Sequence, residues 1–339
     1  MRKSLVVSFI SCAFFSIGIQ SQAAEPLELV QSIPLPHLHD GDFDHFTADL
    51  AGHRLFLTAE KNGAVEVFDL RTNKLIHSIA DFDEPHSMVY RPDLDKLFVV
   101  DGGAAELKIY RADSYEKVGS VKLEDDCDSM AYDPVTKYMY IVNGGRGAHT
   151  PYSFISIVDI TAAKKLADIK IDTDRVEALA LEKSGPRLFV NLTGLNSVGV
   201  IDRKKQTLTT TWSVAPVGQQ NVPLVFDEAD HRLFLVTGKP PTFVVLDSDS
   251  GAIVASVSCV AMVDDLAYDR PRKRLYASGN EFIDVLEQKD ADHYTLIGHV
   301  PSAFRAKTAI LIPELDRYYL AVPGHEGKPA EVRVYKVMP

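Results

Sequence analysis

A fourteen-residue pattern recurs seven times along this chain, and the recurrence constrains the fold more than any other feature. The clearest copy is DSMAYDPVTKYMYI, which begins at residue 128, and the other six copies align with it without gaps. The copies begin at residues 44, 86, 128, 177, 222, 264 and 307. A period of forty-odd residues is typical of repeat folds, in which each unit buries its faces against its neighbours.

Each repeat carries the signals of four β-strands. The fourteen-residue segment contains a short apolar strand, a turn with Asp, Pro or Gly, and a second strand that ends in a bulky pair such as Leu55–Phe56. Turn residues between β-branched and aromatic runs are typical of a hairpin. A third strand with alternating apolar residues is predicted over 64–69, 107–111, 155–160, 198–202, 243–247, 282–286 and 332–337. A fourth, after a polar turn, is predicted over 74–79, 117–121, 165–171, 208–212, 253–260 and 295–300.

The seventh repeat ends at Val337 and lacks a fourth strand of its own. The missing strand is present near the other end of the chain, as LELVQSI over 27–33. We therefore predict an all-β fold, a seven-bladed β-propeller of four-stranded antiparallel blades, closed by an N-terminal strand that completes the last blade. Such closure leaves no unpaired strand edge between the first and last blades.

The repeat also resembles a known family. The stretches FVVDGG (98–103) and YIVNGG (140–145), with ISIVDI (155–160) and VGVID (198–202) after them, resemble the repeat of YVTN-type, YncE-like seven-bladed propellers. The resemblance covers nearly the whole chain after residue 23, although the motif closely matches the family's repeat only in blades two to four. It implies the fold and export from the cytoplasm. It implies no single activity, because related propellers include lactonases, dehydrogenase subunits and binding proteins.

The N-terminus has the composition of a secretory signal peptide. Arg2 and Lys3 precede an apolar stretch over 5–19, and small residues follow over 21–24. We predict a signal peptide over 1–23, a single propeller domain over 24–339, and a periplasmic or secreted location. No later stretch is apolar for long enough to span a membrane.

Charge and cysteine content exclude some partners and chemistries. Without Arg2 and Lys3 the chain has 34 basic and 47 acidic residues, which argues against nucleic acid as a partner because phosphate binding relies on basic patches. We expect a small molecule or an envelope protein as partner, and a monomer. Cys127 and Cys259 belong to different blades, so we expect no disulfide between them and a buried thiol at Cys127.

The seven first positions of the segments are predicted to form a ring at the mouth of the central channel. The innermost strand of each propeller blade lines that channel, so the loops that enter these strands share one face. The first positions are Asp44, His86, Asp128, Glu177, Val222, Asp264 and Lys307. With their neighbours His45 and Asn221, the ionisable members are the candidate ligand-binding residues: Asp44, His45, His86, Asp128, Glu177, Asn221, Asp264 and Lys307.

The unusual stretch HLHDGDFDH, residues 37–45, is the loop that enters the first blade and delivers Asp44 and His45 to the ring. It is also expected to bring polar side chains near the mouth, although His37 and His39 alone favour a solvated loop. The stretch therefore indicates a functional site only if the ring residues to which it contributes Asp44 and His45 bind a ligand.

Four consecutive ring members are predicted to converge on one divalent cation: Asp44, His86, Asp128 and Glu177. Carboxylates with an imidazole suit Zn²⁺ or Mn²⁺, and an all-oxygen subset suits Ca²⁺. Without a cation, crowded carboxylates raise one another's pKa values.

Three interpretations of the ring stay open from the sequence: a hydrated channel lining, a ligand or metal site, and a protein-binding face. Our leading hypothesis is an exported propeller that binds a small ligand, a divalent metal, or both at the channel mouth. One alternative is a metal-dependent hydrolase or lyase of the lactonase-like kind, in which a ring Asp, Glu or His moves a proton. Another is a protein-interaction scaffold in the cell envelope. No motif identifies catalytic residues.

Overall fold

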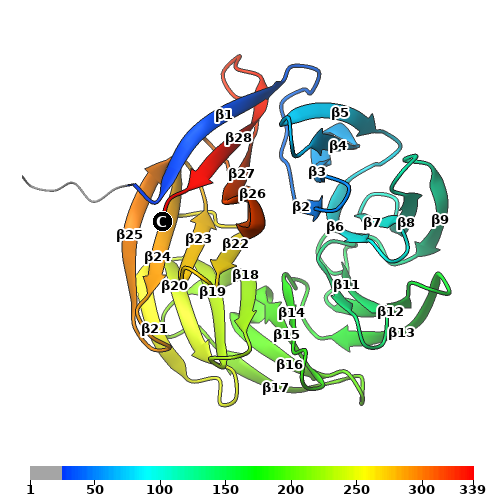
Figure 1. Cartoon of the computed structure of the whole chain (residues 1–339). Coiled ribbons are helices and arrows are strands. Elements are labelled where there is room, and N and C mark those ends of the chain that lie inside the picture. The colour runs from blue at the N-terminus through cyan, green and yellow to red at the C-terminus, as the bar shows by residue number, and fades with distance from the viewer. Residues whose placement is uncertain (1–24) are drawn as a thin grey trace, which may run out of the picture.

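Seven four-stranded antiparallel sheets surround a common axis in the computed structural model, which describes residues 25–339 (Figure 1). The predicted seven-bladed propeller is therefore confirmed. The predicted signal peptide, residues 1–23, lies outside the described residues. In the described part of the chain, no helix has the length and apolarity to cross a membrane.

Each of the first six blades contains four strands that follow one another in the chain. Blade one comprises β2 (Phe46–Asp49), β3 (Arg54–Ala59), β4 (Ala64–Asp69) and β5 (Lys74–Ile79). Blade two comprises β6 (Pro85–Arg91), β7 (Lys96–Asp101), β8 (Glu106–Arg111) and β9 (Lys117–Lys122). Blade three comprises β10 (Met130–Asp133), β11 (Tyr138–Gly144), β12 (Ser153–Asp159) and β13 (Lys164–Ile171). Blade four comprises β14 (Leu179–Leu181), β15 (Arg187–Leu192), β16 (Ser197–Asp202) and β17 (Thr207–Ser213). Blade five comprises β18 (Gln219–Asp227), β19 (Arg232–Lys239), β20 (Pro241–Asp247) and β21 (Ile253–Ser258). Blade six comprises β22 (Leu266–Asp269), β23 (Arg274–Ser278), β24 (Phe282–Gln288) and β25 (Tyr294–Pro301). Blade seven has β26 (Thr308–Ile312), β27 (Arg317–Val322) and β28 (Ala330–Val337), and short 3₁₀ turns occur at η1 (Glu60–Asn62), η2 (Thr193–Leu195) and η3 (Pro313–Leu315).

The N-terminal strand closes the ring as predicted. β1 (Leu27–Leu35) pairs antiparallel with β28, with Leu27 opposite Val337 and Leu35 opposite Ala330. The strand order of this blade is β1-β28-β27-β26, so the two ends of the described chain share one sheet (Figure 1). This pairing satisfies the backbone groups of β28 that would otherwise form an exposed edge.

The hydrophobic core lies between the blades. The described residues form seven apolar clusters, one at each junction between neighbouring blades. At the junction of blades seven and one, for example, Leu35 and Val332 pack with Leu55. Each innermost strand also contacts the innermost strand of the next blade, and β26 contacts β2. The ring therefore holds the first strands at a common radius around the axis.

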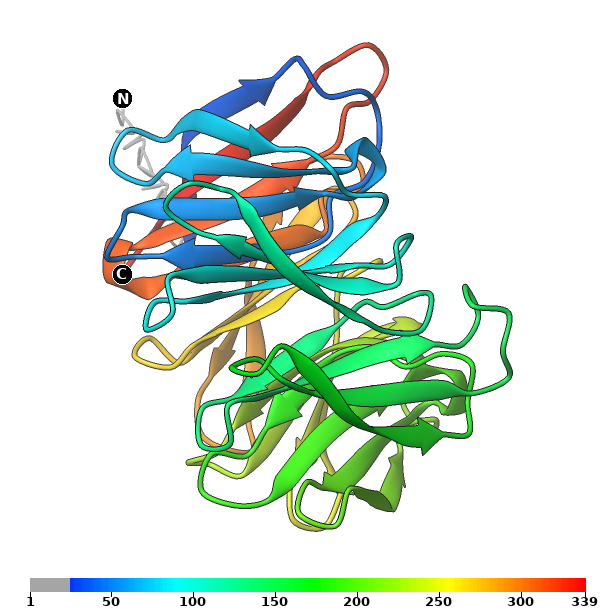
Figure 2. The ribbon, with the colours of Figure 1, turned by 90° about the vertical axis from the view of Figure 1, so that its right-hand side faces the viewer.

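The two faces of the ring have different roles. Figure 2 views the ring from the side, with the strands running between two faces that carry the loops. Because the strands are antiparallel and consecutive, the loops that enter the innermost strands share a face with the loops between second and third strands. We call this the mouth face, and the face that carries the remaining turns the far face.

Many of the acidic side chains serve the turns of the far face. Asp69, Asp202 and Asp247 each end a third strand, and a carboxylate oxygen of each accepts hydrogen bonds from backbone N–H groups two and three residues later. Buried ion pairs join neighbouring blades there, as between Arg203 and Asp133. Much of the acidic surplus of the chain therefore has a structural use away from the mouth face.

Candidate functional site

The seven first positions of the repeats line one cavity at the mouth face. The cavity has a volume of about 490 Å³, and its walls include Asp44, His86, Asp128, Glu177, Val222, Asp264 and Lys307. We call it the mouth cavity. Val222 lies inside β18, and each of the other six residues lies within two residues of the start of an innermost strand. The backbone N–H of Asp128, for instance, donates to Val142 O at 3.0 Å, and that of Glu177 donates to Asn191 O at 3.0 Å. These bonds to the second strand place the side chains at one level.

Asp44 lies at the centre of an acid–imidazole network. His86 Nδ1 donates to Asp44 Oδ2 at 2.7 Å, and His45 Nε2 lies 3.6 Å from Asp44 Oδ1. Burial raises the pKa of Asp44, but the positive charges of His45 and His86 outweigh it and hold that pKa well below its ordinary value. Burial lowers the pKa of His86, but the hydrogen bond and charge of Asp44 outweigh it and raise the pKa to about 10. Near neutral pH, Asp44 is therefore ionised and His86 is positively charged.

His45 is held from its other side by a second carboxylate. Its Nδ1 lies 3.1 Å from Asp265 Oδ1, and Asp265 Oδ2 accepts a hydrogen bond of 2.7 Å from the backbone N–H of Ala309. Burial opposes the charge on His45, but Asp44 and Asp265 raise its pKa well above the usual value. The imidazole is thereby oriented with Nδ1 on Asp265 and Nε2 toward Asp44.

The carboxylates of the cavity differ in how well they are paired. Glu177 accepts a hydrogen bond of 2.8 Å from Arg175 Nε, and Asp264 accepts one of 2.6 Å from Lys307 Nζ. Asp128 has no side-chain hydrogen bond within residues 25–339, and His86 Nδ1 lies 3.9 Å from its Oδ1. Burial and the charge of Asp44 raise the pKa of Asp128 to about 8. Burial also raises the pKa of Glu177, against the effect of Arg175.

One set of side chains has the spacing of a cation site. Asp44, His45 and Asp128 each offer a ligand atom, and these atoms all lie within 4.8 Å of one another. The set shares Asp44 and Asp128 with the four residues predicted from the sequence. His86 Nδ1 is engaged by Asp44 and the Glu177 carboxylate by Arg175, so His45 takes the position expected for an imidazole ligand.

His45 also lines a small void directly under the ring. This void has a volume of about 30 Å³, and Asp44, Asp128, Glu177 and Asp264 border it as well. A space of this size holds one water molecule or one ion. The candidate cation ligands therefore meet where the mouth cavity narrows into the channel.

Other predicted residues lie away from the cavity. Asn221 is fully buried, and its amide donates to Asn191 Oδ1 at 2.7 Å and Ser197 O at 3.0 Å, so it supports the backbone of blades four and five. In the loop over 37–45, His37 Nε2 lies 3.1 Å from Glu66 Oε2, and the backbone of His39 bonds Asn62. The two histidines fasten the loop to blade one and do not line the mouth cavity.

Two arginines that line the mouth cavity were not among the site residues predicted from the sequence. Arg175 and Arg305 line the cavity, and each lies two residues before a first position of the repeat. Gln220 and Met262 hold the same place in their own repeats and also line it. Extending the aligned segments by two residues toward the N-terminus would have identified this upper level.

The two cysteines in the described part of the chain do not line the mouth cavity. Both Cys127 and Cys259 are free thiols, in agreement with the expectation that they form no disulfide. Cys127 is buried, and its burial raises the pKa of the thiol to about 12. A thiol so far from ionisation is a poor nucleophile or metal ligand.

Comparisons with known proteins support the fold and no narrower assignment. No family model matches the chain, and no curated protein matches it. Among solved structures, a chain of hydrazine synthase from Kuenenia stuttgartiensis is 15% identical with a TM-score of 0.70, over 91% of this chain and 96% of that one. A chain of a mitotic checkpoint complex is 13% identical with a TM-score of 0.75, over 99% of each chain. At such identities the likeness shows the fold alone, and the chain is a seven-bladed β-propeller similar to both.

Proposed function

We propose that the protein binds a divalent cation, together with a small polar ligand, at the base of the mouth cavity. The observation that carries the proposal is the arrangement of His45. Its Nδ1 lies on Asp265 and its Nε2 is directed toward Asp44, with a ligand atom of Asp128 nearby. A carboxylate behind the imidazole is the usual means by which proteins orient a histidine toward a metal.

The donor set favours Zn²⁺ or Mn²⁺ over Ca²⁺. Two carboxylates and one imidazole nitrogen suit these transition metals, whereas Ca²⁺ prefers oxygen ligands alone. Three protein ligands leave at least one coordination position for water or for a ligand group. The rest of the mouth cavity, with Arg305 and Lys239 in its wall, has room for a small molecule beside the ion.

Metal binding to tag-free protein tests this proposal. After chelator treatment and dialysis, calorimetric titration with Zn²⁺, Mn²⁺ and Ca²⁺ should show one site, and Zn²⁺ or Mn²⁺ should bind more tightly than Ca²⁺. His45→Gln and Asp128→Asn should each weaken binding by about a hundredfold or more, the range expected on loss of a ligand or its support. Asp113→Asn is the matched control, because Asp113 is exposed in the far-face turn between β8 and β9. Equal affinity in the ring variants and the wild type would refute the site.

A second candidate function is hydrolysis of an ester or lactone at the same place. The observation in its favour is that His86 lines the mouth cavity beside the proposed ligand Asp44, so a carbonyl polarised by the ion has an acid–base group next to it. A panel of lactones and esters, assayed with and without chelator, tests it. Turnover that is insensitive to chelator, or unchanged in His45→Gln, would contradict this mechanism.

We further propose that the chain belongs to the YVTN-type propellers and is exported by its N-terminal segment. The support is the FVVDGG and YIVNGG motifs and the composition of residues 1–23. N-terminal sequencing of the protein from its native host should find a mature end near residue 24. A retained N-terminus, or a protein confined to the cytoplasm, would oppose export.

A further inference from the structure

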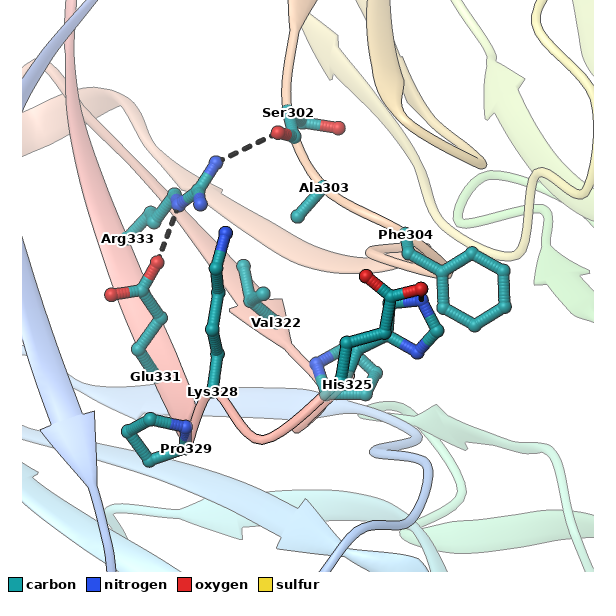
Figure 3. Close-up of a pocket in the computed structure, with 11 residues that line it drawn as sticks. Ser302, Ala303, Phe304, Val322, His325, Lys328, Pro329, Glu331 and Arg333 are labelled. Carbon is teal, nitrogen blue, oxygen red and sulfur yellow. Dashed lines mark hydrogen bonds and ion pairs between the residues drawn. The ribbon is translucent and has the colours of Figure 1, made fainter.

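A second pocket lies on the mouth face, between blades six and seven. It has a volume of about 400 Å³, and it is formed by the loop between β25 and β26 and the loop between β27 and β28. Among residues 25–339, none lines both this pocket and the mouth cavity. We call it the rim pocket, and its principal side chains are Ala303, Phe304, Val322, His325, Lys328 and Arg333 (Figure 3).

A tight hairpin fixes two of these side chains. His325 and Lys328 exchange both backbone hydrogen bonds, at 3.1 and 3.0 Å, and are therefore directly opposite one another. Glu326 and Gly327 between them have φ angles of 51° and 78°, as a two-residue turn with a left-handed backbone requires. Opposite residues of a hairpin project to the same side. The side chains of His325 and Lys328 thus reach the rim pocket from the same side of this hairpin.

One wall of the rim pocket is aromatic. The rings of Phe304 and His325 are stacked, with centroids 4.0 Å apart and planes inclined by 20°. Phe304 is 41% exposed, which is unusual for a phenylalanine. Ala303 and the buried Val322 add apolar surface beside it. This wall suits a flat, apolar group of a ligand.

The opposite wall is cationic. Lys328 Nζ has no hydrogen bond or ion pair to any residue within 25–339, and Figure 3 shows its side chain rising beside Arg333. Arg333 Nε donates to Glu331 Oε1 at 2.7 Å and Nη1 to Ser302 O at 2.9 Å, which holds the guanidinium in place and leaves Nη2 without a hydrogen bond to the described residues. Glu331 is neutralised by Arg333, and the other acid of the pocket, Glu326, is exposed and lies 3.8 Å from His325 Nε2.

We propose that the rim pocket binds a small molecule that carries a planar ring and an anionic group, with the ring against Phe304 and the anion at Lys328. A carboxylate or a phosphate meets this requirement, since both accept hydrogen bonds from the ammonium group and from Arg333 Nη2. The opposed aromatic and cationic walls select for both features in one ligand. The site is independent of the cation site in the mouth cavity.

Benzoate and phenyl phosphate are the probes that test this inference, with benzamide as the ring without charge and acetate as the charge without a ring. In titrations followed by amide NMR, both aromatic anions should shift resonances of residues 302–304 and 325–328. Each should bind at least about tenfold more tightly than either control, a typical gain for a charge-assisted contact. A stronger response to phenyl phosphate than to benzoate would identify phosphate as the preferred anion.

Three variants complete the test. Lys328→Ala should weaken benzoate binding at least about tenfold, and Phe304→Ala should weaken benzoate and benzamide alike. Lys336→Ala is the matched control, because Lys336 is an exposed lysine of β28 outside the rim pocket and its loss should change nothing. The proposal is overturned if neither aromatic anion binds, if Lys328→Ala binds benzoate as the wild type does, or if the shifts lie around Asp128.

Discussion

Replacing Asp128 by asparagine should stabilise the cation-free protein and remove a ligand of the proposed cation site. The side chain is partly buried beside the charged Asp44, with 31% of its surface exposed, it has no hydrogen-bond partner in the described part of the chain, and its pKa is raised from 3.8 to about 8. Asparagine has nearly the same shape and cannot ionise. It therefore removes the unfavourable charge and leaves the packing of the ring in place.

The sign and size of the effect follow from the two pKa values of Asp128. Below pH 3.8 the carboxyl is protonated in the folded and unfolded chains, and the contribution of its raised pKa to folding is fully present. As the pH rises to about 8, the unfolded chain ionises freely while the folded chain resists, so stability is lost. The loss is at most about 1.4 kcal/mol per pH unit, which sets an upper limit of about 6 kcal/mol by pH 8. The advantage of Asp128→Asn should thus grow between pH 4 and 8 and then level off.

Urea unfolding from pH 4 to 9 in the presence of chelator measures this advantage, with the single Trp212 as fluorescent probe. Asp113→Asn, on the far face, should follow the wild type at every pH. His86 loses its charge toward pH 10 in both proteins, so the comparison ends at pH 9. A stability difference that does not vary with pH, or a variant less stable than the wild type at pH 8, would refute the reasoning, because Asp128 would then be a well-solvated lining residue.

Three further predictions concern cation affinity, blade packing and the thiols. Because His45 and Asp128 hold protons near neutral pH, cation binding should release protons, and its affinity measured by calorimetry should rise between pH 6 and 8. Arg203→Ala leaves the buried Asp133 without its partner and should lower the free energy of unfolding by about 3 kcal/mol in urea while cation affinity stays unchanged. Native Cys127 should resist iodoacetamide at pH 8 and react once the chain is unfolded, as mass spectrometry of the labelled peptide would show.

The strands and their closure were predictable from the sequence because both depend on local patterns. The predictions over 64–69 and 74–79 match β4 and β5 to the residue, and the other third and fourth strands differ from the predictions by a residue or two at their ends. It was also predictable that the first positions of the seven repeats lie at one level along the propeller axis. Equivalent positions of a repeat occupy equivalent places in their blades, so a column of the alignment becomes a ring around the axis.

The direction of individual side chains was not predictable, because it depends on loop conformation and on partners distant in the sequence. His45 bonds Asp265, and that contact joins blade one to the start of the sixth repeat, 220 residues further along the chain. Asn221 lies one residue before the ring position Val222, yet its side-chain amide donates a hydrogen bond to Asn191 and does not line the cavity. The turn residues Lys137 and Lys273 adopt left-handed backbone angles that a sequence pattern would assign to glycine or asparagine.

The pairing of charges around the mouth cavity argues for a bound cation over a hydrated lining. Its other carboxylates each have a positive partner close by: Asp44 has His86 at 2.7 Å, Glu60 has Lys61 at 2.8 Å, Glu177 has Arg175 at 2.8 Å and Asp264 has Lys307 at 2.6 Å. Within residues 25–339, Asp128 has no such partner, and His86 Nδ1 is 3.9 Å away. A lining that only holds water has no need to confine an unmatched carboxylate next to Asp44, since that arrangement opposes folding at neutral pH. The divalent ion that we propose between Asp128, Asp44 and His45 would supply the missing positive charge and would account for the unfavourable position of Asp128.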